Sequence, residues 1–241
     1  MQDRYAGDVG DFGKLGLLKA LAGAPGDRLL RVGLIWYLFP NESHNKDGKR
    51  TSYAYVQHCD QELHDGLLEI SRSPMRSVRL IEEKRFLPDN TRYFSETLGF
   101  SGIHFDARSS RRRAWLKAAH DAVSDCDVVC VDPDNGLGTK SVGMLGARGP
   151  KYTFFDDLRP LFARGQSLVI YQHRTRTQLR DQWAIRKAQI ESVLGADHVI
   201  TLKHDSRLYF VVPQPNHEAI LSQRIAALLA GPWRGCFQEV A

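Results

Sequence analysis

Apolar and polar residues follow each other along the chain in blocks that separate buried strands from amphipathic helices. Unbroken apolar runs predict buried strands, and apolar residues repeated every three or four positions predict helices that cover them. Strands are expected at residues 29–38, 127–131, 167–172, 198–202 and 208–212. Helices are expected at residues 10–21, 61–71, 77–83, 109–124, 154–164, 177–194 and 218–229. Because strands alternate with helices over much of the chain, we expect a mostly parallel sheet covered on both faces.

The last two predicted strands are separated only by the short polar turn 203–207. A connection this short joins antiparallel neighbours, so it predicts a C-terminal hairpin at one edge of the sheet. The expected fold is a three-layer α/β sandwich, mostly parallel, with an antiparallel hairpin strand. The sequence contains no internal repeat or low-complexity linker, so residues 1–241 are interpreted as a single α/β domain.

The composition is typical of an ordinary folded domain. The chain has 241 residues, of which 42% are hydrophobic and 25% charged, and these values exclude disordered and fibrous classes. Its longest apolar runs fall well short of the roughly 18 residues that a membrane helix needs. The beginning of the chain does not resemble a signal peptide, so we expect a cytoplasmic protein without membrane contact.

The charged and sulfur-containing residues give weaker indications. The 33 Lys and Arg against 28 Asp and Glu leave a net charge of +5, which is compatible with an anionic substrate or nucleic acid. The spacing of the four cysteines does not match a zinc knuckle, and they are predicted to be reduced thiols. They are Cys59, Cys126, Cys130 and Cys236.

The clearest candidate site follows the apolar strand predicted at 127–131. It consists of five consecutive residues, Asp132, Pro133, Asp134, Asn135 and Gly136. Carboxylate and amide groups at the carboxyl end of a central parallel strand point into the crevice where α/β proteins bind ligands. An ordinary Asp-Pro turn uses the same residues, but the wholly apolar strand before it favours a functional interpretation.

Two further polar segments are expected at the same crevice. Near the N-terminus, Asp8, Asp11 and Lys14 stand among glycines that let a backbone approach a ligand; alternatively, Asp11 is only a helix N-cap and Lys14 is solvated. The loop at 41–49 offers oxygen and nitrogen ligands for a hard metal ion or partners for a ribose, although a plain surface loop has the same composition. Its candidates are Asn41, Glu42, His44 and Asp47.

The order of these motifs resembles that of the Rossmann-like methyltransferases. The elements that carry the resemblance are the Gly-Asp-x-x-Lys segment ending at Lys14, the first strand, the run Asp-Val-Val-Cys-Val-Asp-Pro at 127–133, and the terminal hairpin. Within this superfamily, the chain most resembles the ribosomal-RNA adenine amino-methyltransferases and the three-Cys-motif partner proteins. It departs from their Asp-Pro-Pro-Tyr motif at Asp134 and Asn135, and residues 36–41 lack the glycine-rich turn of the family.

The resemblance implies a Rossmann-like sandwich and S-adenosylmethionine-dependent methyl transfer to a nucleic acid or nucleotide. With it we expect a catalytic group made of Lys14, Asp132, Asp134 and Asn135, of which Lys14 and Asp132 match the family's motifs. The cofactor would be bound by Asp8, Asp11, Tyr37, Asn41, His44 and Asp47. The substrate would be bound by Pro133, Gly136, His173, Arg174, Arg111 and Arg112.

Two other functions stay open at this point. A divalent-metal-dependent nuclease or phosphohydrolase would explain the second aspartate and the missing glycine turn. Its Mg²⁺ or Mn²⁺ would be held by Asp8, Asp11, Asp132 and Asp134. The third function is that of a non-catalytic, methyltransferase-like interaction protein. Serine-hydrolase, zinc-protease and kinase motifs are missing from the sequence.

Overall fold

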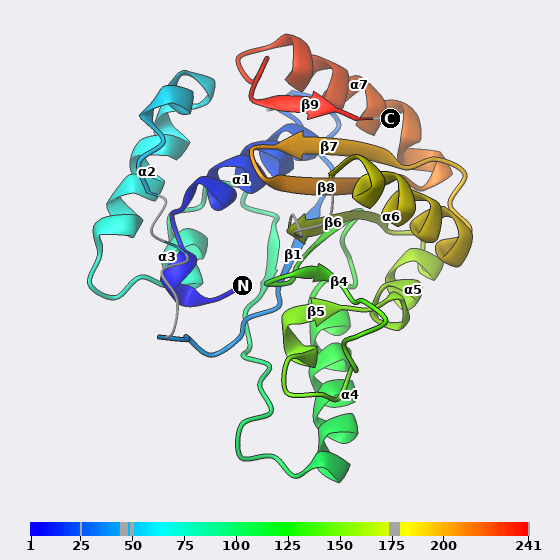
Figure 1. Cartoon of the computed structure of the whole chain (residues 1–241). Coiled ribbons are helices and arrows are strands. Elements are labelled where there is room, and N and C mark those ends of the chain that lie inside the picture. The colour runs from blue at the N-terminus through cyan, green and yellow to red at the C-terminus, as the bar shows by residue number, and fades with distance from the viewer. Residues whose placement is uncertain (25, 44–47, 49–50, 174–178, 241) are drawn as a thin grey trace.

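A seven-stranded sheet forms the centre of the molecule (Figure 1). The structure, a computed structural model, describes residues 1–24, 26–43, 48, 51–173 and 179–240. Across the sheet the strands lie in the order β2-β1-β3-β6-β8-β7-β9. Their bounds are β1 Val32–Trp36, β2 Arg92–Phe94, β3 Val128–Asp132, β6 Ser167–His173, β7 Ile200–His204, β8 Arg207–Val212 and β9 Phe237–Glu239.

The strand directions confirm a mostly parallel sheet with antiparallel strands toward the C-terminus. Strands β2, β1, β3 and β6 are mutually parallel, whereas β8 is antiparallel to both of its neighbours, β6 and β7. The expected hairpin is formed by β7 and β8, but it does not end the sheet, because β9 pairs with the outer side of β7. Five of the seven strands therefore run in one direction.

Helices cover both faces of the sheet and complete a three-layer α/β sandwich. One face packs against α1 Val9–Ala22, α2 Gln61–Arg72, α3 Val78–Glu83 and α7 Pro215–Ala230. The other packs against α4 Phe105–Ala122, α5 Phe155–Ala163 and α6 Leu179–Leu194. The remaining elements are three 3₁₀ helices, η1 Asp3–Tyr5, η2 Ala54–Cys59 and η3 Gly149–Lys151, and a small parallel pair, β4 Gly136–Leu137 and β5 Tyr152–Thr153.

The position of strand β3 inside the covered sheet explains why its sequence before Asp132 is wholly apolar. Successive side chains of a strand point to opposite faces, and both faces of this sheet are covered. Val128 and Cys130 accordingly belong to the core under α1, whereas Val129 and Val131 belong to the core under α4 and α5. The strand is buried along its whole length, so the polar group at its end, Asp132, is held at a fixed place.

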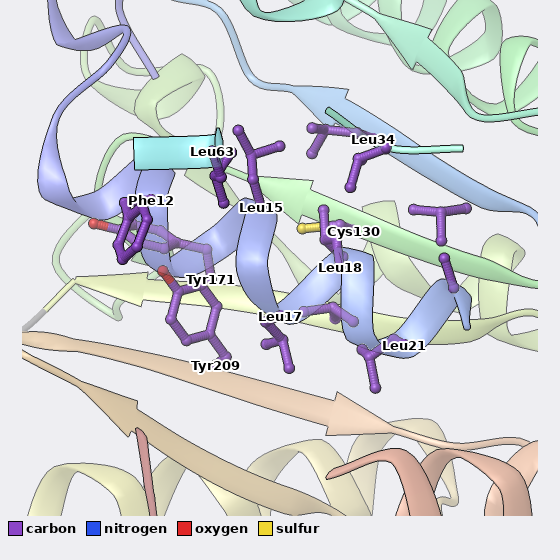
Figure 2. Close-up of a cluster of buried hydrophobic side chains, with 14 of the residues drawn as sticks. Phe12, Leu15, Leu17, Leu18, Leu21, Leu34, Leu63, Cys130, Tyr171 and Tyr209 are labelled. Atoms are coloured by element: carbon purple, nitrogen blue, oxygen red, sulfur yellow. The ribbon is translucent and has the colours of Figure 1, made fainter. Parts of the chain in front are cut away.

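Helix α1 lies directly on the sheet and carries the first part of the candidate site (Figure 2). Its leucines face the core, and three glycines, Gly10, Gly13 and Gly16, form a second stripe along it. A Cβ atom on Gly13 would lie only 2.5 Å from the His204 ring, and one on Gly16 would collide with the Trp233 ring. The glycines therefore let the hairpin and the C-terminal segment approach the helix backbone.

Several elements differ from the expected boundaries. The helix predicted at 109–124 begins at Phe105, so Arg111 and Arg112 stand beyond its first turn. The strand predicted at 29–38 is shorter, Val32–Trp36, and the three-residue strands β2 and β9 are too short to produce a hydrophobic period. Among the described residues, every helix is too short or too polar to span a membrane.

Candidate functional site

A cavity of about 360 Å³ opens at the carboxyl ends of the central strands. The chain leaves β1 toward β2 on one side and leaves β3 toward β6 on the other, so the sheet order reverses between β1 and β3. Such a switch point is where open α/β sheets leave a crevice for ligands. The walls come from the N-terminal segment and α1, from residues 132–135, from Lys151, from the end of β6, and from the β7–β8 turn.

Lys14 provides a buried positive charge at the floor of the cavity. Its Nζ donates to Oδ1 of Asp11 at 2.7 Å and to Oδ2 of Asp132 at 2.8 Å, and it lies 4.4 Å from the centre of the Trp36 ring. Only 3% of the Lys14 side chain is exposed. Burial alone would lower the pKa of Lys14, but the two carboxylates raise it above its usual value. The three residues thus form one charged unit.

Asp8 is the N-cap of α1, which corrects the alternative in which Asp11 has this role. Its Oδ1 accepts from the backbone N–H of Gly10 at 2.7 Å and of Asp11 at 3.2 Å. Its Oδ2 lies 3.2 Å from Nη2 of Arg207, the first residue of β8. Burial raises the pKa of Asp8 although Arg207 acts in the opposite direction.

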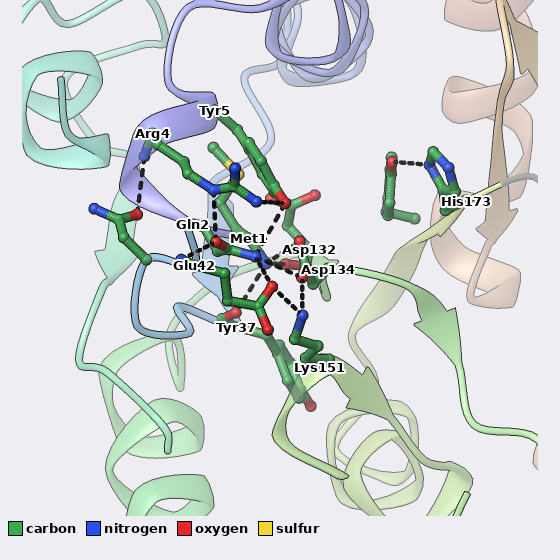
Figure 3. Close-up of polar contacts among 12 residues, drawn as sticks. Met1, Gln2, Arg4, Tyr5, Tyr37, Glu42, Asp132, Asp134, Lys151 and His173 are labelled. Carbon is green, nitrogen blue, oxygen red and sulfur yellow. Dashed lines mark hydrogen bonds and ion pairs between the residues drawn. The ribbon is translucent and has the colours of Figure 1, made fainter. Parts of the chain in front are cut away.

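A second polar network joins the cavity residues Asp134 and Lys151 to Gln2 and Glu42 (Figure 3). Asp134 accepts from Nε2 of Gln2 at 3.0 Å and lies 3.4 Å from Nζ of Lys151 and 3.8 Å from the α-amino nitrogen of Met1. Glu42 accepts from the same Gln2 and Lys151 groups, at 3.0 and 2.5 Å. Burial by itself would raise the pKa of Asp134, but the neighbouring positive charges and the Gln2 hydrogen bond lower it.

Two tyrosines bring aromatic surface to the cavity. Tyr5 lines it from η1, and Tyr171 lines it from β6, with its hydroxyl 3.2 Å from Nδ1 of His173. The sequence interpretation did not single out Tyr5, Tyr171, Ser206 or Arg207 as site residues. Arg207 had a visible signal, since it is a charged residue at the start of an otherwise apolar strand.

The structure brings together all four residues predicted for catalysis and part of those predicted for binding. The cavity is lined by Lys14, Asp8, Asp11, Asp132, Pro133, Asp134, Asn135 and His173. Gly136 lies behind the loop, in β4, with a φ of +100° and the Gln172 side chain against it. Three other predicted residues, His44, Asp47 and Arg174, lie outside the described residues.

The remaining predicted residues lie away from the cavity lining. Tyr37 is buried on the opposite face of the sheet, where its hydroxyl is 3.0 Å from Oγ1 of Thr153. Asn41 is exposed and accepts from the backbone N–H of Arg4. On α4, Arg111 is exposed, whereas Arg112 is buried in an ion pair with Asp157 at 2.5 Å. The interior position of Arg112 makes it a structural residue in this fold.

The charges of the cavity are closely matched. Each of the four aspartates in its lining contacts a cation: Asp11 and Asp132 contact Lys14, Asp8 contacts Arg207, and Asp134 contacts Lys151. The lining therefore contains positive and negative side chains in contact with each other, and the cavity is not a purely acidic pocket. A ligand with groups of both signs finds a partner for each of them here.

Comparison of the chain with protein-family models, with curated proteins and with solved structures finds no significant match in any of the three. The chemistry of the cavity has to be argued from its own residues.

Proposed function

We propose that the protein is an S-adenosylmethionine-dependent, methyltransferase-like enzyme that acts on a nucleic acid or nucleotide. The observation that carries the proposal is the place of Asp132. This carboxylate ends the central strand β3 and, with Pro133 and Asn135, faces the cavity at the switch point of the sheet. The Asp-Pro element on which the resemblance to Rossmann-like methyltransferases rests thus lies where a ligand is expected.

The cavity residues suit the chemical groups of S-adenosylmethionine, which supplies an activated methyl group when bound. This cofactor combines a carboxylate, an ammonium, a sulfonium, a ribose and a flat adenine. Lys151 and Arg207 suit the carboxylate, Asp8 and Asp134 suit the cationic groups or the ribose hydroxyls, and Tyr5 offers a stacking surface for a base. Tyr5 and Tyr171 would supply aromatic surface in place of the tyrosine that the chain lacks in its Asp-Pro motif.

The chain itself would contribute mainly orientation. Lys14 fixes the Asp132 carboxylate through a 2.8 Å hydrogen bond, and the Asn135 backbone is fixed by its N–H bond to the Lys151 carbonyl at 3.0 Å. An acceptor amine that hydrogen-bonds to this rigid loop loses little further freedom on reaching the reactive geometry. We therefore assign Asp132 and Asn135 to holding the acceptor, and Lys14 to positioning Asp132.

The metal-dependent alternative is less well supported. A divalent ion needs several oxygen ligands around one point. Among the described residues, no three of the cavity's carboxylates place oxygen atoms within 4.8 Å of one another, and each of the four has a cationic partner. A metal would have to displace Lys14 or Arg207 from its carboxylates before it could bind.

Calorimetric titration of the purified protein with S-adenosylmethionine and S-adenosylhomocysteine, in the presence of a chelator, tests the cofactor. We expect saturable binding that Asp134→Asn weakens by at least tenfold, because Asp134 lies in the cavity. The matched control is Asp125→Asn, which changes an exposed aspartate paired with Arg31 and Arg92. No binding by folded protein would refute the proposal, and Mg²⁺-dependent cleavage of nucleic acid, lost in Asp132→Asn, would favour the alternative.

A nucleic-acid acceptor makes a separate prediction for α4. This helix exposes Arg111, Arg113 and Lys117, and such groups bind phosphates with release of counterions. Changing all three to alanine should weaken nucleic-acid binding and reduce the slope of log Kd against log salt by about two to three. The control is Arg79→Ala on α3, where the arginine is paired with Glu83. Equal salt slopes for the triple variant and the parent would argue for a free nucleotide as the acceptor.

We place this activity in the cytoplasm. None of the four cysteines is in a disulfide, and the reducing cytoplasm is the compartment that keeps cysteines in this state.

A further inference from the structure

A cluster of three metal-binding side chains lies outside the candidate site. His58 and Cys59 end the 3₁₀ helix η2, and Cys236 lies between α7 and β9, 177 residues further along the chain than Cys59. The Sγ of Cys59 is 2.8 Å from the Sγ of Cys236 and 3.7 Å from Nε2 of His58. Among the described residues, it is the one group in which three possible ligand atoms lie within 4.8 Å of one another.

We infer that His58, Cys59 and Cys236 form a zinc site. Two thiolates and an imidazole are the ligands that Zn²⁺ takes in proteins, and harder ions such as Mg²⁺ prefer oxygen. Although His58 and Cys59 are consecutive, each has a ligand atom within 4.8 Å of the Cys236 sulfur. The set combines one exposed, one buried and one partly buried ligand, so solvent can reach the ion while the protein holds it.

The fourth position of the ion would be open. His58 and Cys236 line a cavity of about 420 Å³, together with His204 and Asp205 from the end of β7 and its turn. Three protein ligands beside a cavity leave room for a water molecule, which is the arrangement of zinc sites that exchange a ligand. The site is separate from the proposed methyltransferase cavity, although Ser206 and Arg207, on the same turn, line that other cavity.

The sulfur atoms have the freedom that zinc binding requires. Two thiolates on a tetrahedral zinc are about 3.8 Å apart, given Zn–S bonds of about 2.3 Å, so the two sulfurs, now 2.8 Å apart, have to separate by roughly 1 Å. Cys236 is partly exposed and follows Gly235, which has a φ of +81° and no atom within 4 Å of a Cβ built on it. This turn is therefore the part that can move.

The test is zinc titration of the reduced, metal-free protein in competition with a chromophoric chelator. We expect one Zn²⁺ per chain, and Co²⁺ in its place should give the thiolate charge-transfer and tetrahedral d–d bands. Cys59→Ser and Cys236→Ser should each weaken zinc binding at least 100-fold. Each should also lower the intensity of the thiolate charge-transfer band, because one thiolate ligand is lost. His58→Gln should weaken zinc binding at least tenfold; because His58 is exposed, this variant tests the site even if a cysteine variant misfolds.

Cys126→Ser is the matched control, because Cys126 is exposed to 6%, as Cys59 is, but lies outside the cluster. It should bind zinc as the parent does. Failure of the folded, reduced protein to bind Zn²⁺ at micromolar concentrations would overturn the inference, as would binding that all three ligand variants retain. A Cys59–Cys236 disulfide found by peptide mass spectrometry, with no zinc binding after its reduction, would assign the pair to thiol oxidation instead.

Discussion

The Nζ atom of Lys14 lies 2.8 Å from Oδ2 of Asp132, although 118 residues separate them in the sequence. Both side chains are almost fully buried, so water could not solvate either charge if its partner were removed. The contact joins the first helix to the end of the central strand, which are two of the three segments from which the sequence predicted a site.

Breaking this contact should be costly. Lys14→Met leaves the carboxylates of Asp11 and Asp132 buried without their cation, and removal of one partner of a buried pair costs about 3 to 5 kcal/mol. Asp132→Asn should be milder, because Lys14 keeps Asp11. Denaturant unfolding of the two single variants and the double variant measures the coupling, which we expect to exceed about 1 kcal/mol. Strictly additive effects would mean that the pair does not contribute as a unit.

The glycine stripe of α1 predicts an unusual response to alanine. In an exposed helix, Gly→Ala stabilises by about 1 kcal/mol. At Gly16 the added Cβ would collide with the ring of Trp233, and overpacking of a core costs about 1 to 3 kcal/mol. We therefore expect Gly16→Ala to lower the free energy of unfolding, and Gly143→Ala, with no neighbour closer than 4.0 Å, to leave it nearly unchanged. A more stable Gly16→Ala variant would contradict the close packing.

Two neighbouring arginines of α4 should behave differently. Arg112→Met leaves the buried Asp157 carboxylate without its cation, so we expect a loss of about 3 to 5 kcal/mol in the free energy of unfolding. Arg111→Ala removes an exposed side chain and should change the same quantity by less than about 0.5 kcal/mol. Thermal and denaturant unfolding compare the two. Similar values for both variants would mean that Arg112 has no structural role.

The different environments of Arg111 and Arg112 can partly be predicted from the sequence. Arg112, Trp115 and Ala119 stand at spacings of three and four, which places all three on the buried face of α4. The sequence interpretation began the helix at 109, which puts these arginines in its first turn, and assigned Arg111 and Arg112 to substrate binding. The buried apolar strands β3, β6, β7 and β8 and the polar motif that follows β3 could be predicted because local patterns encode them, whereas the three-residue strands β2 and β9 could not. The contact between Asp8 and Arg207, 199 residues apart, has no local pattern, so only the fold reveals it.

Two histidines with a lowered pKa, the buried His217 and the half-buried His120, should make stability depend on pH. Burial lowers the pKa of His217 and of His120 below the ordinary value of 6.5. Below pH 6.5 these two histidines therefore bind protons more readily in the unfolded chain than in the folded protein. The free energy of unfolding consequently falls as the pH decreases. Unfolding curves between pH 7.5 and 5.5 should show a smaller decrease for His217→Gln than for the parent. Parallel curves would exclude His217 as a cause.

The walls of the cavity at the switch point come from segments spread along the chain between Met1 and Arg207. Local opening of one segment cannot leave the rest of the cavity intact, because Asp8 is tied to Arg207 and Lys14 to Asp132. Ligand binding is therefore linked to global unfolding. At a hundred times its dissociation constant, any molecule bound there adds about 2.7 kcal/mol to the stability of the whole protein. The melting temperature thus reports on cavity ligands of every class, without an assay for the reaction.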